Sequence, residues 1–381
     1  MRLELDQGNM MINSNLIHFK YLLNMRMFVT TFLFVNIVAL VFIPVTPDEI
    51  SRSALAAEWV ASGQYDFAWP PMLMLINALA KLLGGGAYMT RALFLAIEVY
   101  LFWRLYMSAG FTLSWLAFLI LPYIALVLST ASPQGLMVIL LPLLVCAVSQ
   151  NKFKEIYLVS LALYLTNPTC ILVLLVVAVV GGIFYKKELG RSFCGAAFLA
   201  LISLLIIAYV LFLGGEGFMP TLTNNGPLNL FLGNNASEMS YRGVAEGLEW
   251  TSYSAGQYLA ETITFLLQQP YQFMFNYILK MIFWFAPFDH FRSGIGGGFQ
   301  YALFAYVAVV QAVCYFLFFK NIRNFPGVEL KYAMWIFVAA WLVYAIFFVK
   351  LRFRIPFDFL LFFTACFLSV RTELTFTPKR L

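Results

Sequence analysis

The chain has 381 residues, of which 62% are hydrophobic and 11% are charged, and its formal net charge is +6 at pH 7. A soluble domain contains about 45–50% apolar and about 25% charged residues, so this composition excludes a soluble protein and predicts a polytopic membrane protein. With His18 and His290 as its only histidines, the chain also excludes a histidine-rich metal centre.

The first predicted span, Met27–Pro44, carries no charge and is long enough to cross a bilayer core, which needs about 17–25 residues. Two acids, Asp48 and Glu49, follow it directly. Acids delivered to the membrane surface suggest chemistry at the interface. A second interpretation stays open, because Thr46 and Glu49 have the spacing of a capping box, in which the acids only cap the next helix.

Eight further apolar stretches are predicted to cross the membrane. They are Ala87–Met107, Phe111–Thr130, Pro133–Ser149, Ile156–Tyr185, Phe193–Leu213, Phe299–Phe319, Tyr332–Val349 and Pro356–Val370. One of them, 156–185, is interrupted by Asn167-Pro168 and flanked at both ends by basic residues. Because proline breaks a helix and basic residues stay in the cytoplasm, we expect two short crossings that turn at this break.

Two apolar segments are predicted to lie on the outer surface. Tyr271–Pro287 has Lys280 at its centre, which would cost about 3 kcal/mol inside the bilayer, and Pro70–Leu83 is too short to cross. The result is ten crossings with a cytoplasmic tail at 1–26, a membrane domain at 27–370 and a cytoplasmic tail at 371–381. The outer loops are 45–88 and 214–298.

Several basic residues lie beside apolar segments on the predicted outer side: Arg52, Arg91, Lys280, Lys350, Arg352 and Arg354. Each alone is explained by snorkelling towards lipid headgroups. Together with the acids they suit a reaction in which a carboxylate accepts a proton from a hydroxyl and the bases bind a lipid phosphate. Arg352 and Arg354 are expected to share one side of an extended segment before Pro356.

Six short elements stand in the order found in one family. They are Pro47-Asp48-Glu49, Trp69-Pro70-Pro71 with Thr90-Arg91, Thr166-Asn167-Pro168, Gly233-Asn234-Asn235, Gln269-Pro270 through Lys280 to Phe283-Trp284, and Arg352-Phe353-Arg354-Ile355-Pro356. The succession resembles the GT-C superfamily of glycosyltransferases that use polyprenyl-phosphate sugars, including the protein O-mannosyltransferases and the lipid A aminoarabinose transferases.

The resemblance implies an all-α polytopic membrane protein of GT-C type, with about ten transmembrane helices and juxtamembrane helices on the outer face. It implies inverting sugar transfer, with Asp48 as general base and Glu49 orienting the acceptor or supporting the base. The donor phosphate would be held by Arg52, Arg91, Lys280, Arg352 and Arg354, and the substrate cavity lined by Trp69, Asn234, Asn235 and Trp284.

The implied partners are a polyprenyl-phosphate-linked sugar donor, a glycan, lipid or protein acceptor, and membrane lipids, with no nucleic acid. The implied location is a bacterial inner membrane, with the active site facing the periplasm. No cofactor and no metal ligand are expected, although dependence on a divalent metal stays open.

Two other functions stay open: a transporter or flippase of lipid-linked saccharide, and a polysaccharide polymerase or ligase. A transporter would carry charges at the midplane and show repeated halves, whereas Glu98 is the only midspan charge we expect and no halves repeat. A polymerase should depend on arginines in its outer loops, yet 214–269 offers only Arg242.

Overall fold

The computed structural model describes residues 30–38, 40, 44–63, 69–109, 116–128, 130–184, 187–212, 225–237, 253–286, 298–324, 327–347 and 350–375. All regular secondary structure in these ranges is α-helical, which confirms the predicted all-α class. The predicted tail at 1–26 lies outside the described residues, as do Arg242 and parts of the long outer loop.

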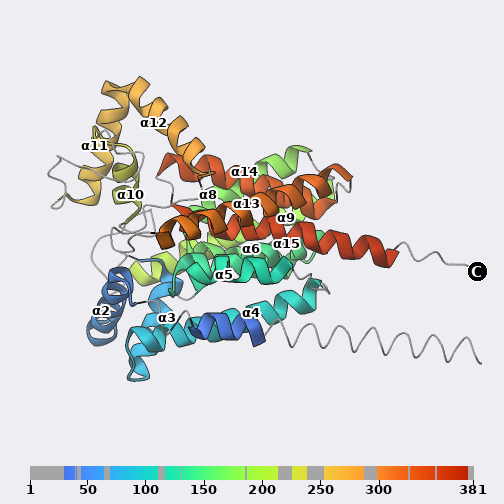
Figure 1. Ribbon diagram of the computed structural model, residues 1–381. Coiled ribbons are helices and arrows are strands. Elements are labelled where there is room, and N and C mark those ends of the chain that lie inside the picture. The colour runs from blue at the N-terminus through green and yellow to red at the C-terminus, as the bar shows by residue number, and fades with distance from the viewer. Residues whose placement is uncertain are drawn as a thin grey trace, which may run out of the picture.

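Residues 30–38 are helical, and the helices that follow form an elongated bundle (Figure 1). They are α2 (Pro47–Ser62), α3 (Pro71–Leu82), α4 (Ala87–Ala109), α5 (Leu116–Leu128), α6 (Pro133–Ser149), α7 (Phe153–Thr166), α8 (Thr169–Phe184), α9 (Lys187–Phe212), α10 (Asn225–Gly233), α11 (Ala255–Gln268), α12 (Pro270–Phe283), α13 (Gly298–Asn324), α14 (Val328–Ile346) and α15 (Leu351–Thr375). Helices α2, α10 and α11 gather at one end, which we call the outer end after the predicted topology, and α15 ends towards the other.

Two helical segments in the described chain are long and apolar enough to cross a membrane, Tyr301–Arg323 and Val328–Ile346. A third candidate is the pair Pro71–Leu82 and Ala87–Ser108, which is bent by 120°. Shorter apolar helices accompany them, among them Pro133–Ser149. These helices support an integral membrane protein, while the count of ten crossings stays a prediction.

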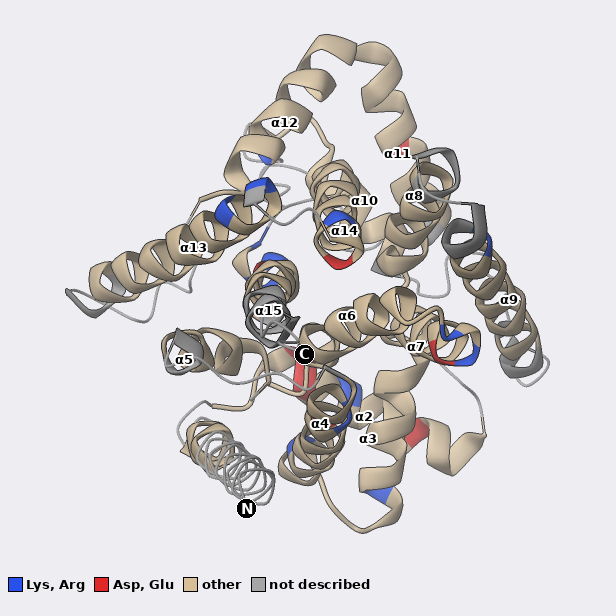
Figure 2. Ribbon diagram, turned by 90° about the vertical axis from the view of Figure 1, so that its right-hand side faces the viewer, with Lys and Arg blue, Asp and Glu red and all other residues tan. Residues whose placement is uncertain are grey.

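Helix α6 lies at the centre of the bundle, with α4, α5, α7, α14 and α15 around it (Figure 2). It contains no charged residue, and nearly all of its side chains are buried. One hydrophobic cluster joins its Leu140 to Tyr164 and Ala340, and a second joins its Ile139 to Ile124 and Phe359. Because α6 packs on all sides, the turn at its N-terminus has a fixed position.

The predicted helix break at Asn167-Pro168 is confirmed, since α7 ends at Thr166 and α8 begins at Thr169. Asn167 is extended, with φ −149° and ψ 106°, and its side chain accepts a hydrogen bond from the amide of Thr169 at 3.1 Å. It also donates to the hydroxyl of Tyr344 at 2.9 Å. The asparagine thereby replaces helix hydrogen bonds that the proline removes.

The segment predicted as a surface helix forms α12, which projects with α11 beyond the bundle (Figures 1 and 2). Its 14 residues span about 21 Å, which is shorter than a bilayer core of about 30 Å. The surface position of α12 stays a prediction.

The prediction of an extended segment at Arg352–Arg354 is wrong, because α15 begins at Leu351 and both arginines are helical. Two interactions favour the helix over the bias of Pro356: Arg354 forms an ion pair with Asp358 one turn later, and Leu351, Ile355 and Phe359 are buried on one stripe. Helical residues two apart diverge by about 200°, so the two arginines point to different places.

Candidate functional site

The two adjacent acids at the start of α2 have different environments. Thr46 is the N-cap, and the capping box is present: the Thr46 hydroxyl accepts from the Glu49 amide at 3.3 Å, and Glu49 Oε2 accepts from the Thr46 amide at 2.7 Å. Pro47 occupies the first turn, where its missing N–H costs nothing. The capping interpretation is therefore confirmed for Glu49, and only for that acid.

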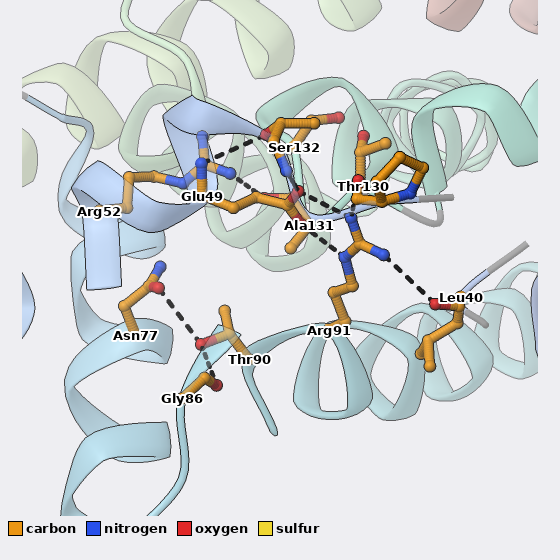
Figure 3. A network of polar contacts seen from close by, with 12 residues as sticks. Leu40, Glu49, Arg52, Asn77, Gly86, Thr90, Arg91, Thr130, Ala131 and Ser132 are labelled. Atoms are coloured by element: carbon orange, nitrogen blue, oxygen red, sulfur yellow. Dashed lines mark hydrogen bonds and ion pairs between the residues drawn. The ribbon is translucent and has the colours of Figure 1, made fainter. Parts of the chain in front are cut away.

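Glu49 also forms a two-pronged ion pair with Arg91 of α4 (Figure 3). Arg91 Nε lies 2.6 Å from Glu49 Oε1, and Nη2 lies 2.8 Å from Oε2. Arg91 donates further to the carbonyls of Leu40 at 3.3 Å and Pro44 at 2.9 Å. Both side chains are buried, and their hydrogen-bonding groups bind the protein itself, so this pair fixes α2 and the preceding chain against α4.

Asp48 is the more exposed of the two acids. Its side chain is 45% exposed, and its contact is with Arg352 of α15, whose Nη1 lies 3.4 Å from Asp48 Oδ2. An exposed pair at this distance contributes about 0–1 kcal/mol, so a ligand can displace it. Of the two acids, only Asp48 has a carboxylate that a molecule in solution can reach.

Arg52 lies one turn after Asp48 on the same face of α2. Its guanidinium is buried, lies 4.9 Å over the ring of Trp69, and donates from Nη2 to the carbonyl of Ala131 at 3.2 Å (Figure 3). Burial lowers the pKa of Arg52 to about 10, while Asp48 and Glu49 oppose that shift, so the group stays charged at pH 7. Its Nε has no hydrogen-bond partner in the described structure.

The turn that holds Arg52 is strained. Ala131 has φ +44°, a left-handed conformation that costs a residue with a side chain about 1–3 kcal/mol. Two hydroxyls in the turn donate to the Val127 carbonyl, that of Thr130 at 3.1 Å and that of Ser132 at 3.0 Å. Ser132 is also the N-cap of α6. This arrangement aims the Ala131 carbonyl at Arg52.

Lys280 of α12 lies in a separate cage of oxygens. Its Nζ donates to the Asn234 side chain at 2.8 Å and to the carbonyls of Phe347 at 2.9 Å, Gly233 at 3.1 Å and Ile346 at 3.4 Å. These groups belong to the C-terminal ends of α10 and α14, where helix dipoles favour a cation. Burial lowers the pKa of Lys280 to about 7.

The two asparagines of the predicted cavity bind the backbone. Asn234 donates to the Ile346 carbonyl at 2.6 Å, which joins α10 to α14 beside Lys280. Asn235 donates to the carbonyls of Phe231 and Leu232 and caps the end of α10. Both side chains are buried, so in this structure they stabilise the outer loop.

Arg354 is part of a third, fully buried network. Its Nε lies 3.0 Å from Asp358 Oδ2, and Asp358 also accepts from the hydroxyls of Tyr123 at 2.5 Å and Tyr315 at 2.8 Å. Arg354 Nη1 donates to the carbonyl of Trp284, whose ring is buried among aromatic side chains. Sequence reasoning missed Asp358, although an acid in an apolar span four residues after an arginine is a signal for such a pair.

The structure thus brings six of the predicted site residues into one group, which we call the outer acid–base cluster: Asp48, Glu49, Arg52, Trp69, Arg91 and Arg352. Lys280, Asn234 and Asn235 lie in the α10–α14 cage, and Arg354 and Trp284 lie in the buried network. No group of three or more His, Cys, Asp or Glu residues is placed to hold a metal ion within the described ranges.

Comparison of the chain with protein-family models, curated proteins and solved structures finds no match in any of the three.

Proposed function

We propose that the chain is a membrane glycosyltransferase of GT-C type, with ten crossings, that moves a sugar from a polyprenyl-phosphate donor to an acceptor hydroxyl at the outer face. The observation that carries this proposal is the contrast between the neighbouring acids. Glu49 is buried and bound to Arg91, whereas Asp48 is half exposed, contacts Arg352 and is close enough to Arg52 for the two charges to interact.

In the proposed reaction, Asp48 accepts the proton of the acceptor hydroxyl as its oxygen forms a bond to the anomeric carbon of the sugar. The bond from that carbon to the donor phosphate oxygen breaks, and the configuration inverts. The phosphate leaves as an anion and needs no general acid. A carboxylate near two guanidiniums suits these steps, because the arginines can bind the phosphate with paired hydrogen bonds.

The geometry narrows the predicted set of phosphate ligands. Arg91, Lys280 and Arg354 are buried and bind protein oxygens, whereas Arg352 is 45% exposed. Arg52 is buried and binds the Ala131 carbonyl, but it lies close enough to Asp48 and Arg352 for their charges to act on it. Arg52 and Arg352 are therefore our proposed phosphate ligands. The Trp69 ring lies 4.9 Å from the Arg52 guanidinium and contributes a cation–π interaction to the cluster.

A matched pair of variants tests the assignment. Asp48→Asn should lower turnover of a polyprenyl-phosphate sugar by about 10²–10⁴-fold, because the amide cannot accept the proton, and should leave the thermal midpoint unchanged. Glu49→Gln should mainly lower the thermal midpoint. Wild-type turnover by folded Asp48→Asn protein would remove Asp48 as the base.

The buried network at Arg354 favours the second candidate, a transporter or flippase of lipid-linked saccharide, because ionisable groups inside a membrane bundle often mark transport pathways. Product analysis separates the two functions. A flippase moves the intact lipid-linked saccharide across a vesicle membrane, whereas a transferase releases polyprenyl phosphate. The proposed location is a bacterial inner membrane with the cluster facing the periplasm.

A further inference from the structure

Glu98, in the middle of α4, is a buried acid outside the proposed active site. Its side chain is fully buried, and neither carboxylate oxygen has a hydrogen-bond partner among the described residues. Glu49 and Asp358, by contrast, are buried acids that each have an arginine partner. A buried carboxylate without a partner is so unfavourable that such a group normally takes up a proton.

The space around Glu98 depends on a glycine at the start of α6. A Cβ added at Gly135 would lie 2.6 Å from Glu98 Oε1 and 3.1 Å from the Val127 carbonyl oxygen. The carboxyl group and this carbonyl therefore approach the same point. That point is next to the turn of Thr130–Ser132, which holds Arg52 through the Ala131 carbonyl.

Among the described residues, the helices packed against α4 supply no charge that neutralises Glu98, and the helical segment 30–38, whose Phe32 packs on Phe102, carries none. Helix α6 has no charged residue. The titratable side chain of α5 is Tyr123, whose hydroxyl donates to Asp358. In α3 the charged residue, Lys81, is exposed. The charged residues of α2 are Asp48, Glu49 and Arg52 of the outer cluster and the exposed Glu58. On α4 itself, Arg91 binds Glu49 two turns away, about 10 Å along the axis, and Arg104 is exposed.

We propose that Glu98 is a proton-binding site inside the bundle and that it holds its proton in the resting protein. Loss of the proton would leave an unpaired charge against Gly135, next to the turn that positions Arg52. Proton occupancy of Glu98 is thus linked to the geometry of the outer cluster. This inference does not depend on sugar transfer and holds equally for a transporter.

Infrared spectroscopy of the purified full-length protein tests the protonation state directly. At pH 7, the wild-type protein should show the C=O stretching band of a protonated carboxylic acid, and the band should be lost in Glu98→Gln. Glu58→Gln, which changes an exposed acid of α2, is the matched control and should keep the band. Because glutamine has nearly the shape of the protonated acid, Glu98→Gln should also keep the wild-type thermal midpoint.

A second measurement decides the matter if the variant does not fold. Dicyclohexylcarbodiimide, an apolar reagent for protonated carboxyl groups, should modify Glu98 of the wild-type protein, as mapped by mass spectrometry. An unmodified Glu98, or an acid band that is the same in wild type and Glu98→Gln, would overturn the proposal. A third result would also overturn the proposal. If the thermal midpoint of the wild type were higher in sodium chloride than in choline chloride, and that of Glu98→Gln were the same in both salts, the site would hold a metal cation and not a proton.

Discussion

Breaking the Glu49–Arg91 ion pair should destabilise the protein more than any change at Asp48. Glu49→Gln removes the charge partner of a buried guanidinium, and the loss of one partner of a buried pair costs about 3–5 kcal/mol. Asp48→Asn breaks only an exposed 3.4 Å contact, for which about 0–1 kcal/mol is expected. The two substitutions are the same chemical change at adjacent positions, so the difference in the free energy of unfolding reports burial and pairing.

The assay is denaturant unfolding of the purified variants in one detergent, completed as a double-mutant cycle with Arg91→Met. Because Glu49 and Arg91 contact one another, the two single changes should not add, and the double variant should be more stable than their sum predicts. Equal destabilisation by Glu49→Gln and Asp48→Asn, or additive effects in the cycle, would refute the assignment of Glu49 to structure.

Three further predictions concern the other groups. Lys280 has a pKa near 7 in the folded protein, below its usual value of about 10.4, so between these two pH values the unfolded chain binds more protons than the folded protein does. The free energy of unfolding should therefore rise with pH across that range. Melting curves recorded at several pH values should show this rise for the wild type and not for Lys280→Met. In donor titrations, Arg352→Lys should weaken donor binding because lysine lacks the planar guanidinium that donates paired hydrogen bonds. Lys350→Arg is the control and should have little effect. Wild-type donor affinity in Arg352→Lys would reduce Arg352 to a membrane anchor. In a variant without reactive native cysteines, Asn225→Cys should react with an impermeant thiol reagent from outside and Asn151→Cys should not, and the reverse pattern would invert the predicted orientation.

Local signals in the sequence were sufficient for several elements. The Thr46–Glu49 spacing predicts the capping box, and Asn167-Pro168 predicts the break between α7 and α8. Both are properties of a few consecutive residues. The composition alone predicts a polytopic membrane protein, because 62% hydrophobic residues is far more than a soluble domain contains.

The environments of the basic residues could not be predicted in the same way. Proline bias alone suggested that Arg352 and Arg354 share a side, but packing and the pair with Asp358 make the segment helical and separate them. Lys280 binds backbone carbonyls at the ends of α10 and α14, which lie 47 and 67 positions away along the chain. The Arg354–Asp358 pair has a local signal in its spacing of four residues, but the partners of Lys280 and Arg91 lie in distant segments and no local pattern encodes them.

The most direct test of sugar transfer is the cleavage reaction itself. Purified protein would be incubated with polyprenyl-phosphate donors that carry a radiolabelled sugar, and both the polyprenyl phosphate released and the label transferred to an acceptor would be measured. We predict that the wild type releases polyprenyl phosphate and transfers the label in equal amounts, and that Asp48→Asn does neither above about 1% of the wild-type rate. Movement of intact donor across the membrane without any release of polyprenyl phosphate would contradict the proposed function.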